Sequence, residues 1–290
     1  DVLALLEHHL ARCGVEVRTG CTVQTLSQSR GGYVVLFSNA DGADESLRAD
    51  AVVCAMGGSA GPQFGTDGFG PRFAAQCGGA LAPLYPCLTA LQCAKPDKRL
   101  AGIRAKARAA LYNGSTLLAD YRGEVQFTEF GVSGPAVFDL SRSAAVEKPP
   151  LTLHIDLLPR LSAADTEALL RQRAALMPEL TTENLLAGVL HNRLGRTVLR
   201  YAGYGLTDPV ASLSPADLRK IAGAAKDFAL PVVSVLGFDG AQVTAGGIRT
   251  AEFDPKTIQS RLVPGLYAAG EVLDIDGDCG GYNLQWAWSS

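Results

Sequence analysis

GLYAAGEVLDIDGDCGGYNLQWAWSS, residues 265–290, joins in one stretch the elements that decide the fold of this 290-residue chain. Its first residues read as a buried strand that ends at Gly270-Glu271, where glycine lets the backbone turn and lie close to a bound molecule. A helix is expected to begin near Gly280-Gly281, and the unpaired amide hydrogens of its first turn carry partial positive charge. Such a helix start favours a ring system that gains negative charge on reduction.

A second strand-to-glycine junction lies in AVVCAMGGSA, residues 51–60. A strand that ends in Gly-Gly is more often an ordinary turn than a ligand site, so this junction alone is a weak signal. Its recurrence at Gly270 strengthens the interpretation. The glycine-rich residues 57–70 then lead into a helical pattern through Phe73, Ala74 and Cys77.

The composition indicates a globular protein with a sizeable core, since 47% of the residues are hydrophobic. The formal net charge of −3 favours neither nucleic acid nor an anionic membrane surface. No apolar run approaches the roughly 18 residues of a spanning helix, and the first residues lack the features of a signal peptide, so a cytoplasmic location is expected. The seven cysteines never form C-x-x-C, which argues against a disulfide framework and a zinc site.

The order of patterns predicts an α/β domain that is interrupted by insertions. A helix over residues 1–13 precedes a strand in VEVRT and a small β-meander. Alternating segments between about Pro86 and Pro159 predict an antiparallel sheet or a small barrel, and three helices with Ser or Thr caps follow up to Phe228. We therefore expect four segments: residues 1–85, 86–160, 161–230 and 231–290, of which the first and last form one domain.

The segment VTAGGIRTAEFDPKTIQSRLVPGLYAAGEVLDIDGDCGGYNLQWAWSS, residues 243–290, resembles the C-terminal signature of the bacterial BaiN-type flavoproteins, also called the aminoacetone oxidase family of FAD-binding NAD(P)/FAD-dependent oxidoreductases. CAMGGSAGPQFGTDGFGPRFAAQCG and FTEFGVSGPAVFDLS are similar to further stretches of this family. The resemblance implies a partial FAD-binding domain, Rossmann-like and of the glutathione-reductase type. An antiparallel β domain and a small helical subdomain would interrupt it.

The chain departs from the family pattern at its beginning. Such proteins start with a strand, G-x-G-x-x-G and a helix, followed by an acidic residue that binds the ribose, and neither feature is present here. We interpret the sequence as a truncated form of a longer flavoprotein. The hypothesis follows that this chain alone binds FAD weakly or not at all, and a stoichiometric flavin absorbance band that survives gel filtration would contradict it.

The resemblance assigns cofactor contacts residue by residue. Val23 on the meander matches a backbone contact to adenine, although a plain core valine is an equal alternative. Asp67 has a helix N-cap as its alternative. Gly270 and Glu271 match the segment that runs beneath the ribityl and phosphate groups. The other matched residues are Ala55, Met56, Gly57 and Gly58 beside the dinucleotide, Thr66 and Gly68 in the following turn, and Gly281, Asn283, Leu284 and Gln285 at the helix start that faces the flavin.

No residue type in the pattern identifies the catalytic group. Tyr282 and Cys279 are weak candidates, since packing accounts for both and no second cysteine lies near enough to resolve a disulfide. The acids of the D-I-D-G-D run, residues 274–278, lack the later glutamate of a calcium loop. We expect solvated acids there and no metal.

The sequence therefore predicts an FAD-dependent oxidoreductase that acts on a small organic molecule, with NAD(P)H as a candidate electron donor. Nucleic-acid and membrane partners are not expected, and the oligomeric state stays open. One alternative is a non-catalytic fragment whose insertion binds RNA, for which Arg193, Arg196 and Arg200 on one helical face form the candidate patch. A structural α/β protein with a vestigial site is the other alternative.

Overall fold

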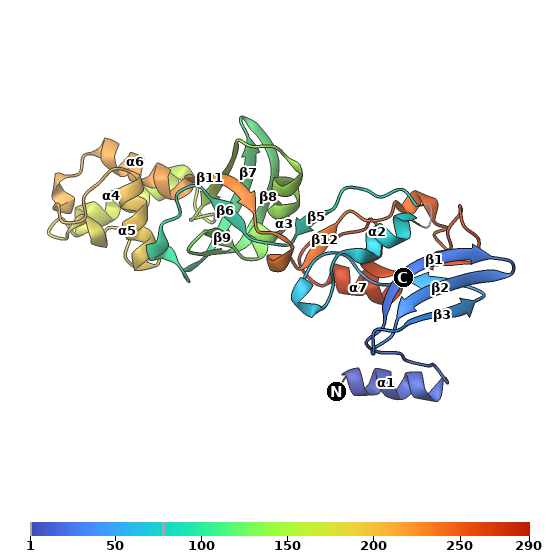
Figure 1. Cartoon of the computed structure of the whole chain (residues 1–290). Coiled ribbons are helices and arrows are strands. Elements are labelled where there is room, and N and C mark those ends of the chain that lie inside the picture. Colours follow the sequence, from blue (N-terminus) through green and yellow to red (C-terminus); the bar gives the residue numbers. More distant parts are fainter. Residues whose placement is uncertain (1, 77–78) are drawn as a thin grey trace.

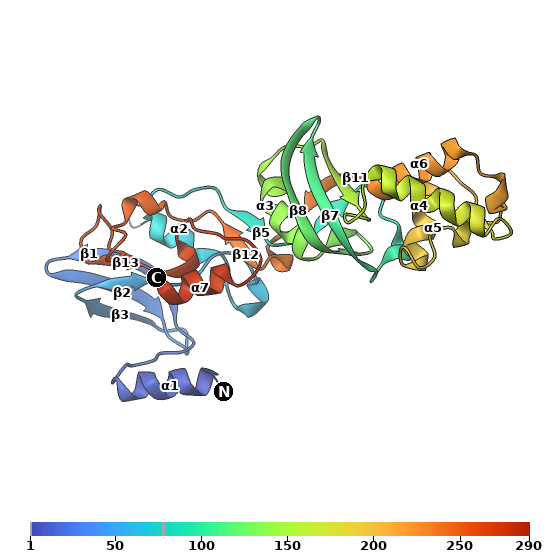
Figure 2. The same cartoon turned by 180° about the vertical axis from the view of Figure 1, so that it is seen from behind.

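The computed structural model describes residues 2–76 and 79–290, and Cys77, which the sequence placed on a helix, lies outside them. Three parts follow one another along the molecule (Figure 1). We call them the helical part (residues 162–226), the barrel (residues 88–161 and 227–235) and the α/β part (the remaining described residues). Within the α/β part, helix α1 stands apart beside the sheet of β1, β2 and β3, and the view from behind shows the same order of parts (Figure 2).

The α/β part consists of small sheets. The predicted meander is present as β1 (Thr22–Ser29), β2 (Gly32–Ser38) and β3 (Asp44–Ala49), all antiparallel. Strand β4 (Val52–Cys54) pairs in parallel with β13 (Leu266–Ala268), whereas β5 (Tyr85–Cys87) pairs antiparallel with β12 (Val243–Ala245). The first and last segments of the chain thus form one part, and both junctions of strand and glycine belong to it.

The helices of the α/β part cover it unevenly. They are α1 (Val2–Arg12), α2 (Phe69–Gln76) and α7 (Tyr282–Ser289). Helix α1 carries the predicted apolar spacing, yet none of its residues is buried. The strand predicted in VEVRT does not form: residues 15–19 have no strand partner, and Val15 and Val17 are exposed. Alternation alone cannot make a strand without a neighbouring edge to accept its hydrogen bonds.

The barrel resolves the choice that the sequence left between a sheet and a barrel. Its strands close in the order β10-β11-β6-β9-β8-β7. They are β6 (Leu91–Cys93), β7 (Arg104–Asn113), β8 (Thr116–Phe127), β9 (Gly131–Ser133), β10 (Leu151–Asp156) and β11 (Phe228–Val235), and α3 (Pro135–Val146) packs on β8. Strand β11 pairs with β10 and β6, so the chain leaves the barrel after Val235 rather than at the boundary of residue 230 drawn from the sequence.

The helical part confirms two of the predicted caps. Helix α4 (Ala163–Leu176) has a capping box of Ser162 and Asp165, and α6 (Pro215–Lys226) has one of Ser214 and Asp217. The Ser or Thr cap expected for the second of the three helices is wrong, because α5 covers Asn192–Tyr201 after a short turn and loop and has His191 as its N-cap. The imidazole of His191 accepts a hydrogen bond from Arg193 N there and caps α5.

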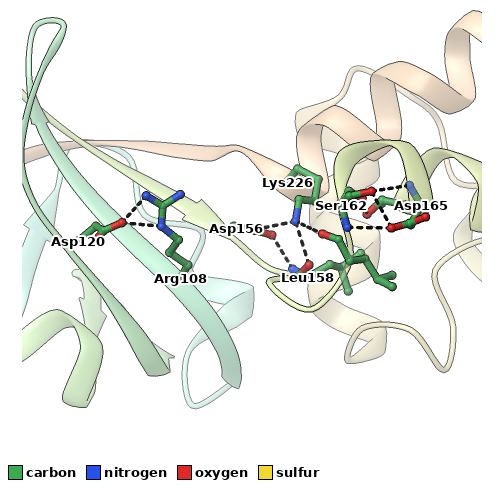
Figure 3. Close-up of polar contacts among 9 residues, drawn as sticks. Arg108, Asp120, Asp156, Leu158, Ser162, Asp165 and Lys226 are labelled. Atoms are coloured by element: carbon green, nitrogen blue, oxygen red, sulfur yellow. Dashed lines mark hydrogen bonds and ion pairs between the residues drawn. The ribbon is translucent and has the colours of Figure 1, made fainter.

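A partly buried lysine connects the helical part to the barrel. Lys226 Nζ donates to Asp156 Oδ2 at 2.6 Å and to the carbonyl of Leu158 at 2.9 Å (Figure 3). Arg108 and Asp120 pair across the outer faces of β7 and β8 in the same view. One hydrophobic core runs through the barrel and the helical part, whereas smaller separate clusters support the α/β part.

Candidate cofactor-binding site

The two strand-to-glycine junctions lie side by side. Strands β4 and β13 are parallel neighbours with Ala268 opposite Cys54, and Ala269 N donates to the Cys54 carbonyl at 3.0 Å. Both strands therefore end at the same edge, where the turns at Gly57 and Gly270 begin. In open α/β sheets, ligands bind outside the carboxyl ends of the parallel strands.

A threonine and a glutamate hold the first turn in place. Thr244 Oγ1 accepts hydrogen bonds from Ser59 N at 2.7 Å and Ala60 N at 2.9 Å. Thr244 N in turn donates to Glu271 Oε1 at 2.8 Å. A Cβ atom on Gly58 would lie 2.3 Å from the Thr244 hydroxyl and 2.4 Å from Glu271 Oε1. Glycine at 58 is thus required by this close packing, and the contact joins both junctions directly.

Burial raises the pKa of Glu271, and the nearby Asp276 carboxylate adds to that rise. The hydrogen bonds from Thr244 oppose it, because they stabilise the charged form. The balance leaves Glu271 easier to protonate than a free glutamate. The Glu271 carboxyl group packs against the turn at Gly58.

The turn before α2 accounts for its residues by local hydrogen bonds. Thr66 Oγ1 donates to the Gly58 carbonyl at 2.6 Å and accepts from Gly68 N at 3.2 Å. Asp67 Oδ1 accepts from Phe69 N, the first residue of α2, at 2.7 Å. Both the cap and the cofactor roles of these residues stay predictions.

Helix α7 begins where the glycine pair predicted. Its N-cap, Gly281, has φ +96°, a left-handed conformation that favours glycine. The Asn283 side chain donates to the Gly277 carbonyl and accepts from Gly277 N, both at 2.9 Å. Its amide group therefore fixes the preceding loop. Gln285 donates to Ser289 Oγ, and the Leu284 side chain is 71% exposed.

The other end of α7 is tied to the second junction. Trp286 Nε1 donates to the Gly270 carbonyl at 3.1 Å, and Gly270 N donates to Ser290 Oγ at 2.7 Å. The helix therefore lies against the turn at Gly270, as η7 (Gly270–Val272) and α7 are direct neighbours. The C-terminal end of α7 thus adjoins the second glycine turn, and the helix extends from there to its amide-bearing start.

The remaining predicted contacts flank this region. Val23 is half-buried against the small core of the α/β part, at a register shift between β1 and β2 that interrupts the hydrogen-bond ladder. Ala55 and Met56 are exposed where β4 leaves its sheet. Val23 thus has the packing role of its alternative, while its backbone lies at an irregular point of the strand.

Asp276 departs from the expectation of solvated acids, whereas Asp278 in the same loop is exposed. Asp276 is only 6% exposed at its side chain, and Arg142 Nε on α3 donates to Asp276 Oδ2 at 2.8 Å. The buried thiol of Cys87 lies 3.9 Å from the same oxygen, and burial together with Asp276 raises the pKa of that thiol to about 11. The loop therefore joins the α/β part to the barrel, because the charge of Asp276 is compensated across the joint.

Cys279 lies at the same joint, just before α7. Its backbone N donates to Asp139 Oδ1 on α3 at 2.6 Å. Burial raises the pKa of the Cys279 thiol, and the carboxylates of Asp139 and Asp278 add to the rise. The thiol is thus kept protonated, unlike a nucleophilic cysteine. Tyr282 is 66% exposed in the first turn of α7.

The predicted arginine patch is partly engaged within the protein. Arg196 pairs with Glu183 at 3.2 Å, and Arg193 donates to the Arg99 carbonyl at 3.1 Å. Within residues 2–76 and 79–290, no group of three His, Cys, Asp or Glu side chains is arranged to hold a metal ion. In the same residues, no helix combines the length and the apolar character needed to cross a bilayer.

The region offers the surface that a flavin dinucleotide requires. Gly57 has φ +72° and open space where a Cβ would point, and the N-cap Gly281 is equally open. Exposed apolar side chains of Val53, Met56 and Leu284 border these turns. Backbone that can be approached closely, apolar side chains and a helix start match the phosphates and the ring of FAD. The residues present therefore fit the group.

Sequence reasoning missed the residues that hold the site together. Thr244, Asp139 and Arg142 each bridge segments that are far apart in the chain. A single threonine in a strand or a single charge in a helix gives no pattern to recognise. The one signal for Thr244 was the motif VTAGG, which begins the stretch that resembles the BaiN-type flavoproteins.

The chain matches the model of one protein family and is similar in sequence to several enzymes. The model of a family described as "HI0933-like protein Rossmann domain" matches residues 1–290. The chain is 38% identical to a 3-dehydro-bile acid delta(4,6)-reductase of Clostridium scindens, over 100% of the chain and 71% of that protein. These matches confirm the family predicted from the sequence.

Two further relatives carry another name. A ribosomal RNA dihydrouridine synthase of Escherichia coli is 33% identical over 84% of this chain, and its counterpart in Haemophilus influenzae is 30% identical over 82%. The chain spans 60% and 58% of the lengths of these two proteins.

Proposed function

The chain belongs to the HI0933-like family of FAD-dependent Rossmann-domain proteins, and on this premise we propose that it forms the main part of an oxidoreductase that reduces a carbon–carbon double bond. The observation that carries the proposal is the meeting of Gly58, Thr244 and Glu271 at the ends of the paired strands β4 and β13. The substrate would be a small organic molecule, held at the joint where the acidic loop before α7 meets α3.

The names of the relatives support this reaction type. A delta(4,6)-reductase adds hydrogen to carbon–carbon double bonds of a 3-oxo steroid, and dihydrouridine is uridine with its ring double bond reduced. Both double bonds are conjugated with a carbonyl group, which makes the far carbon an acceptor of hydride. The shared chemistry therefore concerns a conjugated C=C bond, although the two substrates differ greatly in size.

The predicted binding residues would hold FAD by backbone and shape. Gly57, Gly58 and Gly270 would let the chain approach the dinucleotide, while Thr244 keeps the first turn rigid. FAD, when bound, supplies the two-electron transfer to the substrate. Amide hydrogens at the start of α7, around Asn283, would favour negative charge on the ring edge near them.

Hydrogenation of a C=C bond also needs a proton at the second carbon. The raised pKa of Cys279 keeps Sγ protonated, and this thiol lies beside the joint between α7 and α3. We assign the Cys279 thiol as the first candidate donor and the exposed Tyr282 hydroxyl as the second. A general acid of this kind contributes about 10²–10⁴-fold to a rate.

RNA is the less favoured substrate for this chain. Its formal charge is −3, and cations on the barrel face carboxylates, as in the pairs Arg108–Asp120 and Arg104–Glu124. Phosphate binding instead needs basic side chains that are free to release counterions. A small conjugated carbonyl compound suits the chemistry without this requirement.

The test begins with the protein supplemented with FAD under anaerobic conditions. Bleaching of the flavin band by NADPH or NADH would support the candidate donor, and reoxidation by progesterone, a 3-oxo-4-ene steroid, would support the reaction. Reoxidation by uridine-containing RNA but not by progesterone would move the substrate class to RNA. A bound and reduced flavin that neither compound reoxidises would overturn the proposal, whereas a chain that binds no FAD would bear out the weak binding expected for a partial flavoprotein.

Substitutions of Cys279 and Tyr282 distinguish between the two candidate proton donors. Cys279→Ala should lower the rate of reoxidation by progesterone by about 10²-fold or more if its thiol is the donor, with flavin reduction unchanged. Tyr282→Phe serves as the matched control and should change little. The reverse result would assign the proton to Tyr282.

A further inference from the structure

A cavity of about 410 Å³ lies between the barrel and the helical part. It forms where η2 (Lys98–Leu100) and α5 meet the barrel at β6, β9 and β11. Figure 1 shows the helical part on the side of the barrel away from α7, so this cavity is separate from the glycine turns. Its volume falls within the range of about 300–1,000 Å³ in which proteins enclose small ligands.

The cavity has a cause in the strand lengths. Strand β6 ends at Cys93, and its pairing with β11 starts only at Val232. The earlier residues of β11 pair with β10 along one edge, and their other edge lies beside α5. There Ala229 N donates to the Tyr201 hydroxyl oxygen at 3.3 Å. A side chain of α5 thus takes the place of a strand partner and leaves room beside it.

The floor of the cavity is apolar and aromatic. Leu100, Phe127 and Phe228 are buried there, and the Phe228 ring lies 4.8 Å from the Tyr201 ring and 6.3 Å from the Phe127 ring. Tyr201 itself is 48% exposed, so one aromatic wall is open to a ligand. Such a wall favours a flat apolar body, because ring faces and edges pack against it.

The rim carries an excess of positive charge. Lys95, Arg99 and Arg200 line it, and the single carboxylate among the lining residues is Asp97. Arg99 pairs with Asp97 Oδ2 at 2.7 Å, and Thr197 Oγ1 donates to the same oxygen at 3.1 Å. Within the described part of the chain, neither Lys95 nor Arg200 has an ion pair. Two cations therefore remain above an apolar floor.

We propose that this cavity binds a small flat apolar carboxylate, with its ring against Tyr201 and Phe228 and its carboxylate between Lys95 and Arg200. A neutral ring compound would provide no counter-charge for Lys95 and Arg200. A highly charged ligand would not bury the apolar floor of the cavity. The site is independent of the flavin region, so the proposal stands or falls separately from the oxidoreductase function.

The probe is 2-naphthoate, measured by isothermal titration calorimetry with the purified full chain. The neutral analogue 2-naphthamide has the same ring system and tests the contribution of the charge. We expect 2-naphthoate to bind at one site and more tightly than 2-naphthamide by about tenfold, because only the carboxylate forms charge-assisted hydrogen bonds with the two cations.

Exposed variants distinguish the two halves of the site without threatening the fold. The double change Lys95→Gln and Arg200→Gln should weaken 2-naphthoate by about tenfold and leave 2-naphthamide unchanged. Tyr201→Ala should weaken both compounds. Lys98→Gln, a nearby exposed cation that does not line the cavity, is the matched control and should change neither affinity.

Three results would overturn the proposal. They are the absence of heat from 2-naphthoate at millimolar concentration, equal affinity for the charged and neutral compounds, and equal weakening by Lys98→Gln and by the double variant. The last result would show that the anion responds to the general charge of the surface rather than to this cavity.

Discussion

The barrel and the α/β part of this protein reach stability by different routes. Each barrel strand has partners on both sides, and one buried core continues from the barrel into the helical part. The α/β part instead has the two-stranded pairs β4–β13 and β5–β12, small clusters and exposed apolar side chains such as Val53. The barrel is complete within its own residues, whereas the α/β part presents apolar surface beside its glycine turns.

This difference places the FAD-dependent stability in the α/β part. A molecule that binds the native state alone stabilises it by about 2.7 kcal/mol at a concentration one hundred times its Kd. Such a gain matters most where the protein core is small. Addition of FAD should therefore protect the α/β part from hydrogen exchange and leave the barrel unchanged.

The largest expected loss of stability comes from large-to-small substitutions that create a cavity in either hydrophobic core. Leu153→Ala in the barrel and Leu273→Ala in the α/β part should each cost about 2–5 kcal/mol, since both side chains are buried. Saturating FAD should restore the hydrogen-exchange protection of the α/β part in Leu273→Ala but should not restore the barrel in Leu153→Ala. Hydrogen exchange followed by mass spectrometry measures both regions in one experiment.

If FAD restored hydrogen-exchange protection in both variants, the barrel and the α/β part would unfold as one unit. That result would contradict the difference in stability drawn between them. Val233→Ala, an exposed position on β11, is the control and should cost less than about 0.5 kcal/mol.

An intermediate effect is expected from two buried threonines. Thr244→Val removes the acceptor of Ser59 N and Ala60 N and should destabilise the α/β part by about 1–3 kcal/mol. Thr89 is equally buried, but its hydroxyl oxygen has no hydrogen-bond partner among the described residues. Thr89→Val should therefore be neutral or stabilising by about 1 kcal/mol. Urea unfolding compares the pair, and equal losses would remove the role given to the Thr244 hydroxyl.

The smallest effect concerns pH. The pKa of Glu271 in the folded protein lies above the ordinary value of 4.5 for a glutamate, mainly because of burial. The folded state therefore holds this proton more tightly than the unfolded state, so its stabilising contribution is present below pH 4.5 and is lost as the pH rises through the raised pKa. Glu271→Gln should flatten this decline in thermal melts between pH 4.5 and 7. An unchanged slope would show that other groups cause it.

The sequence by itself determined the family, the glycine junctions, the start of α7 and the capped helices, because each depends on residues close together in the chain. Even the meander followed from alternation and turn residues. Prediction from the sequence failed where a local pattern depends on distant residues for its outcome. The strand expected in VEVRT has no partner strand, and the Asp276 side chain is buried against Arg142.

Only the tertiary structure decided that β11 closes the barrel, that Thr244 and Glu271 lock the turn at Gly58, and that a cavity opens beside Tyr201. Each of these depends on residues brought together from distant segments. Their hydrogen bonds and packing arise from strand pairing and burial across the whole chain, and a pattern of neighbouring residues does not encode which distant edge a strand will meet.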